Sequence, residues 1–221
     1  MRPGGDQVIP RPKNWRPGEA APWADARGDL AGLDEVLRRI AERGAGAPPL
    51  APLAGGRPSA VLIALFDAGA GPEVVLTRRA RHLRNHHGEV SFPGGRIEPD
   101  ETPVAAALRE ADEEVALDPA LVTVIGELDH LATLASRSVI APVVGRLDGR
   151  PRLKAETGEV DRILTVPLAE LLRTDTYHEE RWGSDIGERT IHFFELDDET
   201  VWGATARMLV QLLAIATGVW P

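Results

Sequence analysis

The feature that most constrains this chain is an acidic segment that follows a glycine pair and a basic segment. Residues 98–114 contain seven acidic residues, and Arg109 is the only basic residue among them. Residues 78–87, in contrast, contain four arginines and three histidines and no acid. Crowded carboxylates call for a cation, and clustered guanidinium groups suit a phosphate. The two adjoining segments therefore predict a site for a metal ion and an anionic substrate.

An amphipathic helix is predicted for residues 102–115. Four apolar side chains recur at the spacing of one helical face: Val104, Leu108, Ala111 and Val115. Glu110 and Glu114 would be neighbours on the opposite side, with Glu113 beside them. Because the segment offers oxygen ligands without histidine or cysteine, it favours Mg²⁺ or Mn²⁺ over zinc. The alternative interpretation of such a run is a solvated helix face.

The spacing of these residues resembles the Nudix box, the loop–helix–loop signature of Nudix hydrolases. Gly95 is followed six residues later by Glu101, and eight residues after that begins the run Arg109-Glu110-Ala111-Asp112-Glu113-Glu114. The resemblance implies a Nudix-type α+β fold, in which α-helices flank a mixed central β-sheet. It also implies an enzyme that uses a divalent metal ion to hydrolyse a nucleoside diphosphate linked to another group.

The same resemblance assigns metal ligands to four positions. Glu110, Glu113 and Glu114 match the metal-binding carboxylates, and Gly95 would offer its carbonyl oxygen near the metal. Glycine suits that place because the missing Cβ permits a close approach of the backbone. The metal would neutralise the diphosphate, orient it and generate hydroxide near neutral pH.

Three residues form the expected catalytic set: Glu101, Arg109 and Glu113. Glu101 and Arg109 match the pair that ties the loop to the helix, so their roles are expected to be mainly structural. The general base is not assigned by the resemblance, and Glu159, in an acidic stretch further along the chain, is one candidate.

One departure from the box concerns the end of the helix. The box normally closes with a glycine and an aliphatic residue, and this chain has Ala116 and Leu117 there. A glycine just past a helix usually supplies a left-handed conformation. Alanine in that geometry would cost roughly 1–2 kcal/mol. We therefore expect strain at Ala116 but no loss of a catalytic group.

The basic segment resembles the additional motif of the coenzyme A diphosphatase subgroup. The matching stretch runs from Leu76 through Arg84 and Gly88 to the Phe92-Pro93-Gly94-Gly95 sequence, and Val75 stands where leucine is usual. This resemblance predicts three substrate-binding residues: Thr77, Arg79 and Arg84. Each arginine has the alternative of an ordinary surface salt bridge. Trp202-Gly203-Ala204-Thr205 also resembles the subgroup, more weakly.

The predicted reaction is the hydrolysis of coenzyme A, and of acyl-CoA as a further substrate, to 3′,5′-ADP and 4′-phosphopantetheine. One alternative is a diphosphatase for ADP-ribose, nucleotide sugars or dinucleotides, because the Nudix box alone does not select the substrate. A second alternative is a sensor that binds nucleotide without turnover. The intact Glu110, Glu113 and Glu114 argue against the sensor.

The rest of the chain is divided into an N-terminal part, residues 1–58, and a hydrolase domain, residues 59–221. The first part is expected to contain an irregular proline-rich arm, an amphipathic helix and a linker, at residues 1–27, 29–43 and 44–58. Strands are predicted at residues 60–66, 73–77, 90–92, 121–130, 138–146, 161–166 and 190–196. A closing helix is predicted for residues 201–219.

Composition limits the other possibilities. The chain of 221 residues has no cysteine, which excludes disulfides and thiolate metal sites. A formal net charge of −9 argues against nucleic-acid binding. The sequence has no apolar run of the roughly 18 residues that a membrane span requires, and no apolar signal core follows Met1. A cytoplasmic protein is expected, with a homodimer as a possible assembly.

Overall fold

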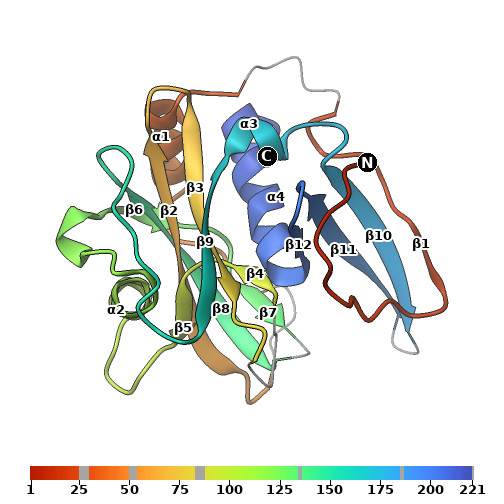
Figure 1. Cartoon of the computed structure of the whole chain (residues 1–221), viewed down its shortest axis with the longest axis horizontal. Helices are drawn as coiled ribbons and strands as arrows, with labels where there is room; N and C mark the ends of the chain where they lie inside the picture. The colour runs from red at the N-terminus through yellow and green to blue at the C-terminus, as the bar shows by residue number, and fades with distance from the viewer. Residues whose placement is uncertain (25–29, 50–53, 83–87, 134–135, 185–186, 221) are drawn as a thin grey trace.

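Two β-sheets enclose one long helix in the computed structural model (Figure 1). The structure describes residues 1–24, 30–49, 54–82, 88–133, 136–184 and 187–220. The larger sheet is mixed, because β2 and β8 are parallel and the other paired strands are antiparallel. The predicted α+β class, with helices flanking a mixed central sheet, is confirmed.

Eight strands form the larger sheet. Its path is β4-β3-β2-β8-β6, with β5 added to β2, β7 to β8 and β9 to β3. The strands are β2 (Arg57–Asp67), β3 (Pro72–Arg79), β4 (Val90–Ser91), β5 (Gly94–Arg96), β6 (Thr123–Glu127), β7 (Leu131–Thr133), β8 (Ser138–Arg146) and β9 (Val160–Pro167).

Four strands form the second sheet, in the order β1-β10-β11-β12. They are β1 (Trp15–Pro17), β10 (Tyr177–Ser184), β11 (Gly187–Glu195) and β12 (Thr200–Trp202). The helical elements are α1 (Leu33–Arg43), α2 (Pro103–Val115), η1 (Pro119–Leu121), α3 (Leu168–Leu171) and α4 (Gly203–Thr217).

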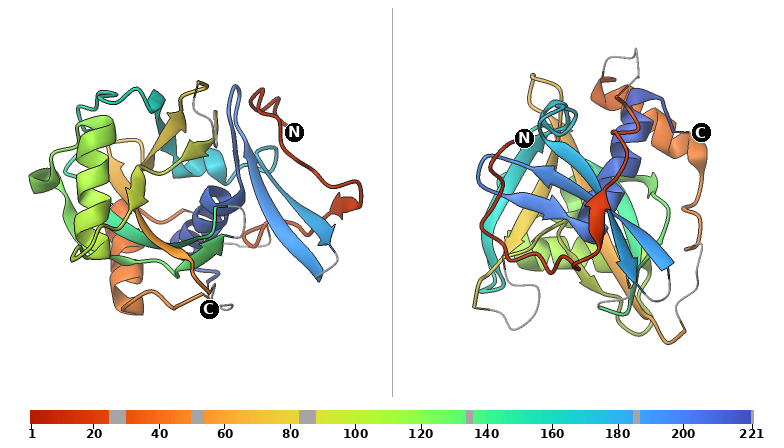
Figure 2. Two further views of the ribbon diagram at one scale, coloured as in Figure 1. Left: turned by 90° about the horizontal axis from the view of Figure 1, so that it is seen from below. Right: turned by 90° about the vertical axis from the view of Figure 1, so that its right-hand side faces the viewer.

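Alternating side chains of β2 divide the interior into two cores. Leu62 and Phe66 point to the face that α2 covers, whereas Ile63 and Leu65 point to the face that α1 and α4 cover. The second sheet packs against α4 from the other side, so the layers run α2, larger sheet, α1 with α4, second sheet (Figure 2). Eleven of the fifteen residues of α4 are buried because the helix is covered on both sides.

Several predicted boundaries differ from the structure. The arm was expected to be irregular, but residues 15–17 form β1 and pair with β10. The first predicted helix starts at Leu33 rather than at residue 29, because Gly32 takes an extended conformation at its N-terminus. The predicted linker ends earlier than residue 58, since β2 begins at Arg57.

Further differences concern the strands and the closing helix. The predicted strand at residues 121–130 is shorter, because η1 precedes it and it ends at Glu127. The closing helix begins at Gly203 and not at residue 201, because residues 200–202 form β12. Strands β5, β7 and β10 were not predicted. In the described part of the chain, no helix is long and apolar enough to cross a membrane.

Candidate active site

Helix α2 carries the acidic residues and is fixed at both ends. Its N-terminus is capped by the Thr102 hydroxyl, which accepts a hydrogen bond of 3.1 Å from the Ala105 N–H, and Pro103 occupies the first turn. The apolar face packs against β2 and β5. This packing brings the carboxylates of α2 next to the Gly94-Gly95 pair.

The helix ends at Ala116 in the expected left-handed conformation, with φ 54° and ψ 37°. The Ala116 N–H donates to the Asp112 carbonyl at 2.9 Å, and the following Leu117 is buried. The expectation of a positive φ at this alanine is therefore confirmed.

Glu114 is the most buried carboxylate of the helix. Its side chain accepts a hydrogen bond of 3.3 Å from the Gly94 N–H to Oε2. Burial raises the pKa of Glu114 to about 7, the Gly94 bond opposes this rise, and the nearby Glu110 adds to it. Arg79 is the cation that acts in the opposite direction. The carboxyl thus lies in a place where a bound cation would strongly favour its charged form.

Glu110 lies against Gly95, so that a Cβ at Gly95 would displace the Glu110 carboxylate from its present position. A Cβ at Gly94 would instead clash with the backbone of Ala60 and Val61. Close approach of the backbone therefore requires glycine at Gly94, and glycine at Gly95 leaves room for the Glu110 carboxylate. Burial raises the pKa of Glu110, and Arg109 opposes that rise.

Arg109 joins the loop before α2 to the helix. Its guanidinium donates to both oxygens of Glu101, from Nε at 2.9 Å and from Nη2 at 3.1 Å, and Nη2 also donates to the Arg96 carbonyl at 3.1 Å. Nη1 reaches Glu110 Oε1 at 3.0 Å and Glu113 Oε2 at 3.3 Å. The Arg109 hydrogen bonds lower the pKa of Glu101. Glu101 and Arg109 thus form a bidentate tie of the predicted kind.

The residues of α2 fit a hard divalent cation by chemistry, although their side chains do not converge as they stand. Among the described residues, no group of three or more His, Cys, Asp or Glu side chains is arranged to hold a metal ion. The reason is that Arg109 engages Glu110 and Glu113, and Glu113 is 54% exposed. Burial raises the pKa of both Glu110 and Glu114, and a bound divalent cation would favour the charged form of each. These two carboxylates could hold Mg²⁺ or Mn²⁺ beside Gly95, and Glu113 would join after turning away from Arg109.

A cleft of about 680 Å³ opens beside the glycine pair. Its walls come from the arm, the larger sheet and the start of α4, and they include Gly94, Gly95 and Arg79. Apolar side chains such as Phe92, Ile140 and Met208 line much of it. A cleft of this volume that combines apolar walls with polar groups is typical of small-molecule sites.

The predicted substrate residues occupy different places. Arg79 lines the cleft, and its Nη2 donates to Glu159 Oε2 at 3.1 Å. Thr77 is buried behind the cleft, where its hydroxyl lies 3.3 Å from the carbonyl of Ser91, a residue of the cleft wall. Arg84 lies outside the described residues. Arg78 is held by carboxylates, with Glu199 at 2.6 Å from Nη1.

Sequence reasoning missed several parts of the cleft wall. Val8 and Pro10 belong to the arm, which gave no functional signal, and Ser138 and Ile140 belong to an ordinary buried strand. The residues 202–205 also line the cleft, and here the weak subgroup resemblance was the available signal.

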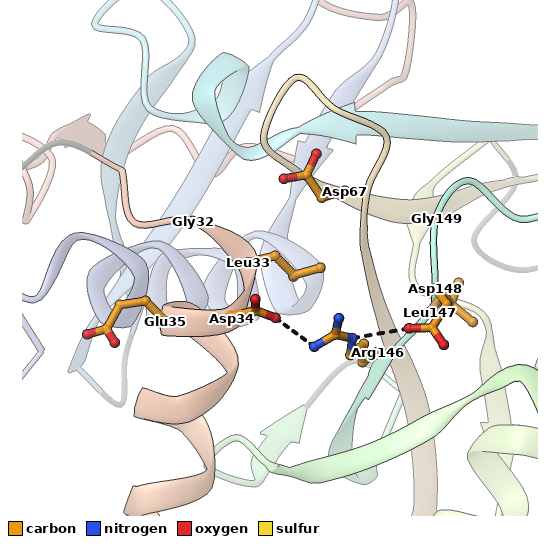
Figure 3. A pocket seen from close by; sticks show the side chains of 9 residues that line it. All are labelled: Gly32, Leu33, Asp34, Glu35, Asp67, Arg146, Leu147, Asp148 and Gly149. Atoms are coloured by element: carbon orange, nitrogen blue, oxygen red, sulfur yellow. Dashed lines mark hydrogen bonds and ion pairs between the residues drawn. The ribbon is translucent and has the colours of Figure 1, made fainter.

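A second hollow, of about 430 Å³, lies at the other end of β2 and is shown in Figure 3. There the Arg146 guanidinium bonds to Asp34 at 2.6 Å and to Asp148 at 3.4 Å. Asp67 lines this hollow and Ser59 lines the cleft, and these residues are about 25 Å apart along the strand. The hollow shares no lining residue with the cleft.

The sequence matches a known family over most of its length. A family model described as NUDIX domain matches residues 56–194, which include the glycine pair, α2 and the basic segment. Nudix hydrolases act on nucleoside diphosphate derivatives and generally use divalent metal ions. The chain belongs to the Nudix family and is a Nudix hydrolase.

Curated relatives carry the same family name. The chain is 38% identical to the uncharacterized Nudix hydrolase NudL of Enterobacter sp. (strain 638) over 169 residues, which is 75% of this chain and 85% of that protein. It is 37% identical to NudL of Escherichia coli (strain K12 / DH10B) over 166 residues, with the same coverage. A solved structure, the MutT/nudix family protein from Enterococcus faecalis, covers 83% of this chain and 74% of its own at 16% identity, with a TM-score of 0.49.

Proposed function

We propose that this Nudix hydrolase cleaves the diphosphate of coenzyme A, and of acyl-CoA, to give 3′,5′-ADP and 4′-phosphopantetheine or its thioester. The observation that carries the proposal is that Arg79, from the basic segment, and the Gly94-Gly95 pair line one cleft. A guanidinium at this place would bind a phosphate group while the carboxylates of α2 act on the adjoining diphosphate. The apolar walls suit the pantetheine half of the substrate.

We assign the metal ion, Mg²⁺ or Mn²⁺, to Glu110, Glu113 and Glu114 together with the Gly95 carbonyl. A bound divalent ion would supply charge neutralisation for the diphosphate and activation of the attacking water. Arg109 and Glu101 keep the loop before α2 in place, so that Gly95 stays against Glu110. Their contribution to the reaction is one of positioning.

Arg79 has a second function in this proposal. In the structure the Arg79 guanidinium forms an ion pair with Glu159, whose side chain is more than half exposed. A substrate phosphate would compete with Glu159 for Arg79, because a guanidinium binds phosphate in the same bidentate manner as carboxylate. Substrate binding would therefore release the Glu159 carboxylate near the carboxylates of α2, where it would accept a proton from water.

The proposal is tested by incubating the purified chain with coenzyme A, ADP-ribose and dinucleoside polyphosphates, each with Mg²⁺ and with Mn²⁺. Formation of 3′,5′-ADP from coenzyme A, at a kcat/KM at least tenfold above that for the other substrates, is the expected result. Faster hydrolysis of ADP-ribose or of dinucleotides would show that one of these compounds, and not coenzyme A, is the preferred substrate. Nucleotide binding without any product would indicate a sensor.

The metal assignment is tested with Glu114→Gln, which keeps the shape of the side chain and removes its charge. We expect turnover to fall at least about a hundredfold, or roughly 3 kcal/mol of activation free energy, with an unchanged circular dichroism spectrum. The control is Glu98→Gln, which changes an exposed acid of the loop before α2. If Glu114→Gln keeps the wild-type rate at limiting Mg²⁺, this face of the helix does not bind the metal.

A further inference from the structure

The N-terminal arm places an exposed apolar side chain at the edge of the cleft. Val8 lines the cleft and is nevertheless 93% exposed, and Pro10 lines it two residues later. Covering an exposed apolar side chain with an apolar part of a ligand removes it from water and stabilises the complex. Ile9, between them, does not line the cleft. The arm thus directs Val8 and Pro10 to the cleft, whereas Ile9 is not part of its lining.

Just before Val8 the arm is attached to the segment that joins β3 and β4 of the larger sheet. The Gln7 side-chain amide donates to the Gly88 carbonyl at 2.5 Å, and Asp6 accepts from Arg81 Nη2 at 2.7 Å. Gly88 is itself bonded to the end of β3, because its N–H donates to the Arg79 carbonyl at 3.0 Å. This attachment connects the arm to the strand that carries the substrate-side arginine.

Just after Pro10 the arm is attached to the second sheet. Arg11 Nε lies 2.8 and 3.0 Å from the two oxygens of Glu180, a buried carboxylate of β10 that also accepts from Trp182 Nε1 at 2.7 Å. The Arg11 guanidinium also lies over the Phe193 ring, 5.2 Å from its centroid. Breaking this attachment would leave Glu180 buried without its cation, so Arg11 holds the arm firmly.

Residues 7–11 therefore run from the segment that joins β3 and β4 to the second sheet, with Val8 and Pro10 lining the cleft between these two fixed points. The wall opposite is formed by apolar residues of the larger sheet and α4, including Ile140 and Met208. A ligand whose phosphates lie at Arg79 and Gly95 would extend its non-nucleotide half along this apolar space.

We infer that the arm is a specificity element, and that Val8 and Pro10 form the wall against which the acyl group of an acyl-CoA thioester packs. The inference rests on the proposed function. It assigns discrimination between acyl-CoA thioesters and free coenzyme A to a segment outside the residues matched by the family model, which start at residue 56. The arm acts by contact with the acyl chain and takes no part in the cleavage.

The test compares Val8→Trp and Val8→Asp in the full chain, with Ile9→Trp as the matched control. The readout is the kcat/KM for octanoyl-CoA divided by that for coenzyme A. Val8→Trp should lower this ratio at least fivefold by filling the acyl space, and Val8→Asp should lower it similarly by placing a charge against an apolar chain. Ile9→Trp should leave the ratio within twofold of wild type. A thermal scan of each of the three variants serves as the control that the variant is folded.

The possible failures are distinguishable. If the wild-type chain hydrolyses coenzyme A and the two Val8 variants keep the same ratio as Ile9→Trp, the inference about the arm is overturned and the proposed function stands. If the wild-type chain hydrolyses neither coenzyme A nor its thioesters, both are overturned.

Discussion

Replacing Ala116 with glycine should stabilise the protein, although glycine usually destabilises. Ala116 follows α2 with φ 54°, where the methyl group of an L-residue costs roughly 1–2 kcal/mol. Glycine removes that cost, but its greater conformational freedom in the unfolded chain cancels about 0.4–1 kcal/mol of the stabilisation. Loss of a half-buried methyl group offsets about 0.4 kcal/mol more. The expected net gain for Ala116→Gly is about 0.5 kcal/mol.

The matched control is Ala105→Gly, the same substitution at an exposed position in the first turn of the same helix, where φ is not positive. Glycine at an ordinary helical position costs roughly 0.5–1 kcal/mol. For a chain of this size, 1 kcal/mol corresponds to about 2–4 °C in Tm. Ala116→Gly should therefore raise Tm by about 1–2 °C, whereas Ala105→Gly should lower it by a similar amount or more.

The assay is a thermal scan of wild type and both variants, with and without Mg²⁺. The increase in Tm on adding Mg²⁺ should be the same for wild type and Ala116→Gly, because no carboxylate of α2 moves. If Ala116→Gly lowers Tm as much as Ala105→Gly does, Ala116 is unstrained and the reasoning is refuted. A changed response to Mg²⁺ would show that the end of α2 positions the metal ligands.

Three further predictions concern charge. Arg79→Ala should reduce kcat/KM for coenzyme A about tenfold more than for dephospho-coenzyme A if this arginine binds the 3′-phosphate; equal losses would assign it to the diphosphate. Since burial raises the pKa of Glu114 to about 7, Mg²⁺ binding should strengthen as the pH rises from 6 to 8 and should release a proton at pH 6.5. Calorimetry in two buffers of different ionisation enthalpy measures that proton, and Glu114→Gln should abolish its release. Burial lowers the pKa of His192 to about 4. Between pH 6.5 and pH 4 the unfolded chain therefore binds a proton at this histidine that the folded chain does not bind. The free energy of unfolding should fall by up to about 3 kcal/mol as the pH drops through that range. His192→Asn, which keeps an acceptor for the Tyr177 hydroxyl, should flatten this fall in urea titrations.

The parts of the fold that could be predicted are those in which local sequence and burial agree. Helix α2 was expected at residues 102–115 from its regular apolar face and is found at Pro103–Val115, where the Thr102 cap and Pro103 fix its start. Strand β2 was likewise recognisable from its apolar run. Strand β10 was missed because Tyr177–Ser184 is mostly polar and is held by pairing with strands on both sides.

For the candidate site, the sequence indicated that Glu110 lies near Gly95 and that Glu101 pairs with Arg109, whereas metal binding by Glu110, Glu113 and Glu114 stays a prediction. The spacing from Gly95 to Glu114 indicated which side chains meet, and the contact of Gly95 with Glu110 agrees with it. The pairing of Arg109 with Glu113 was not predicted, although these residues are four positions apart on one helix and that spacing makes them neighbours. Val8 could not be assigned to the cleft either, since its position depends on hydrogen bonds to residues far away in the chain.

We expect strand β1 to limit self-association of the molecule. It covers the outer side of β10 only at residues 180–182, and it ends at Pro17, which has no N–H to offer a further strand. Without it, an eight-residue strand with free backbone donors and acceptors would form the border of the second sheet, and such borders recruit strands from other molecules. A shortened chain that begins after residue 17 should therefore lose solubility as well as its arm, and a version made for crystallisation should retain residues 15–17.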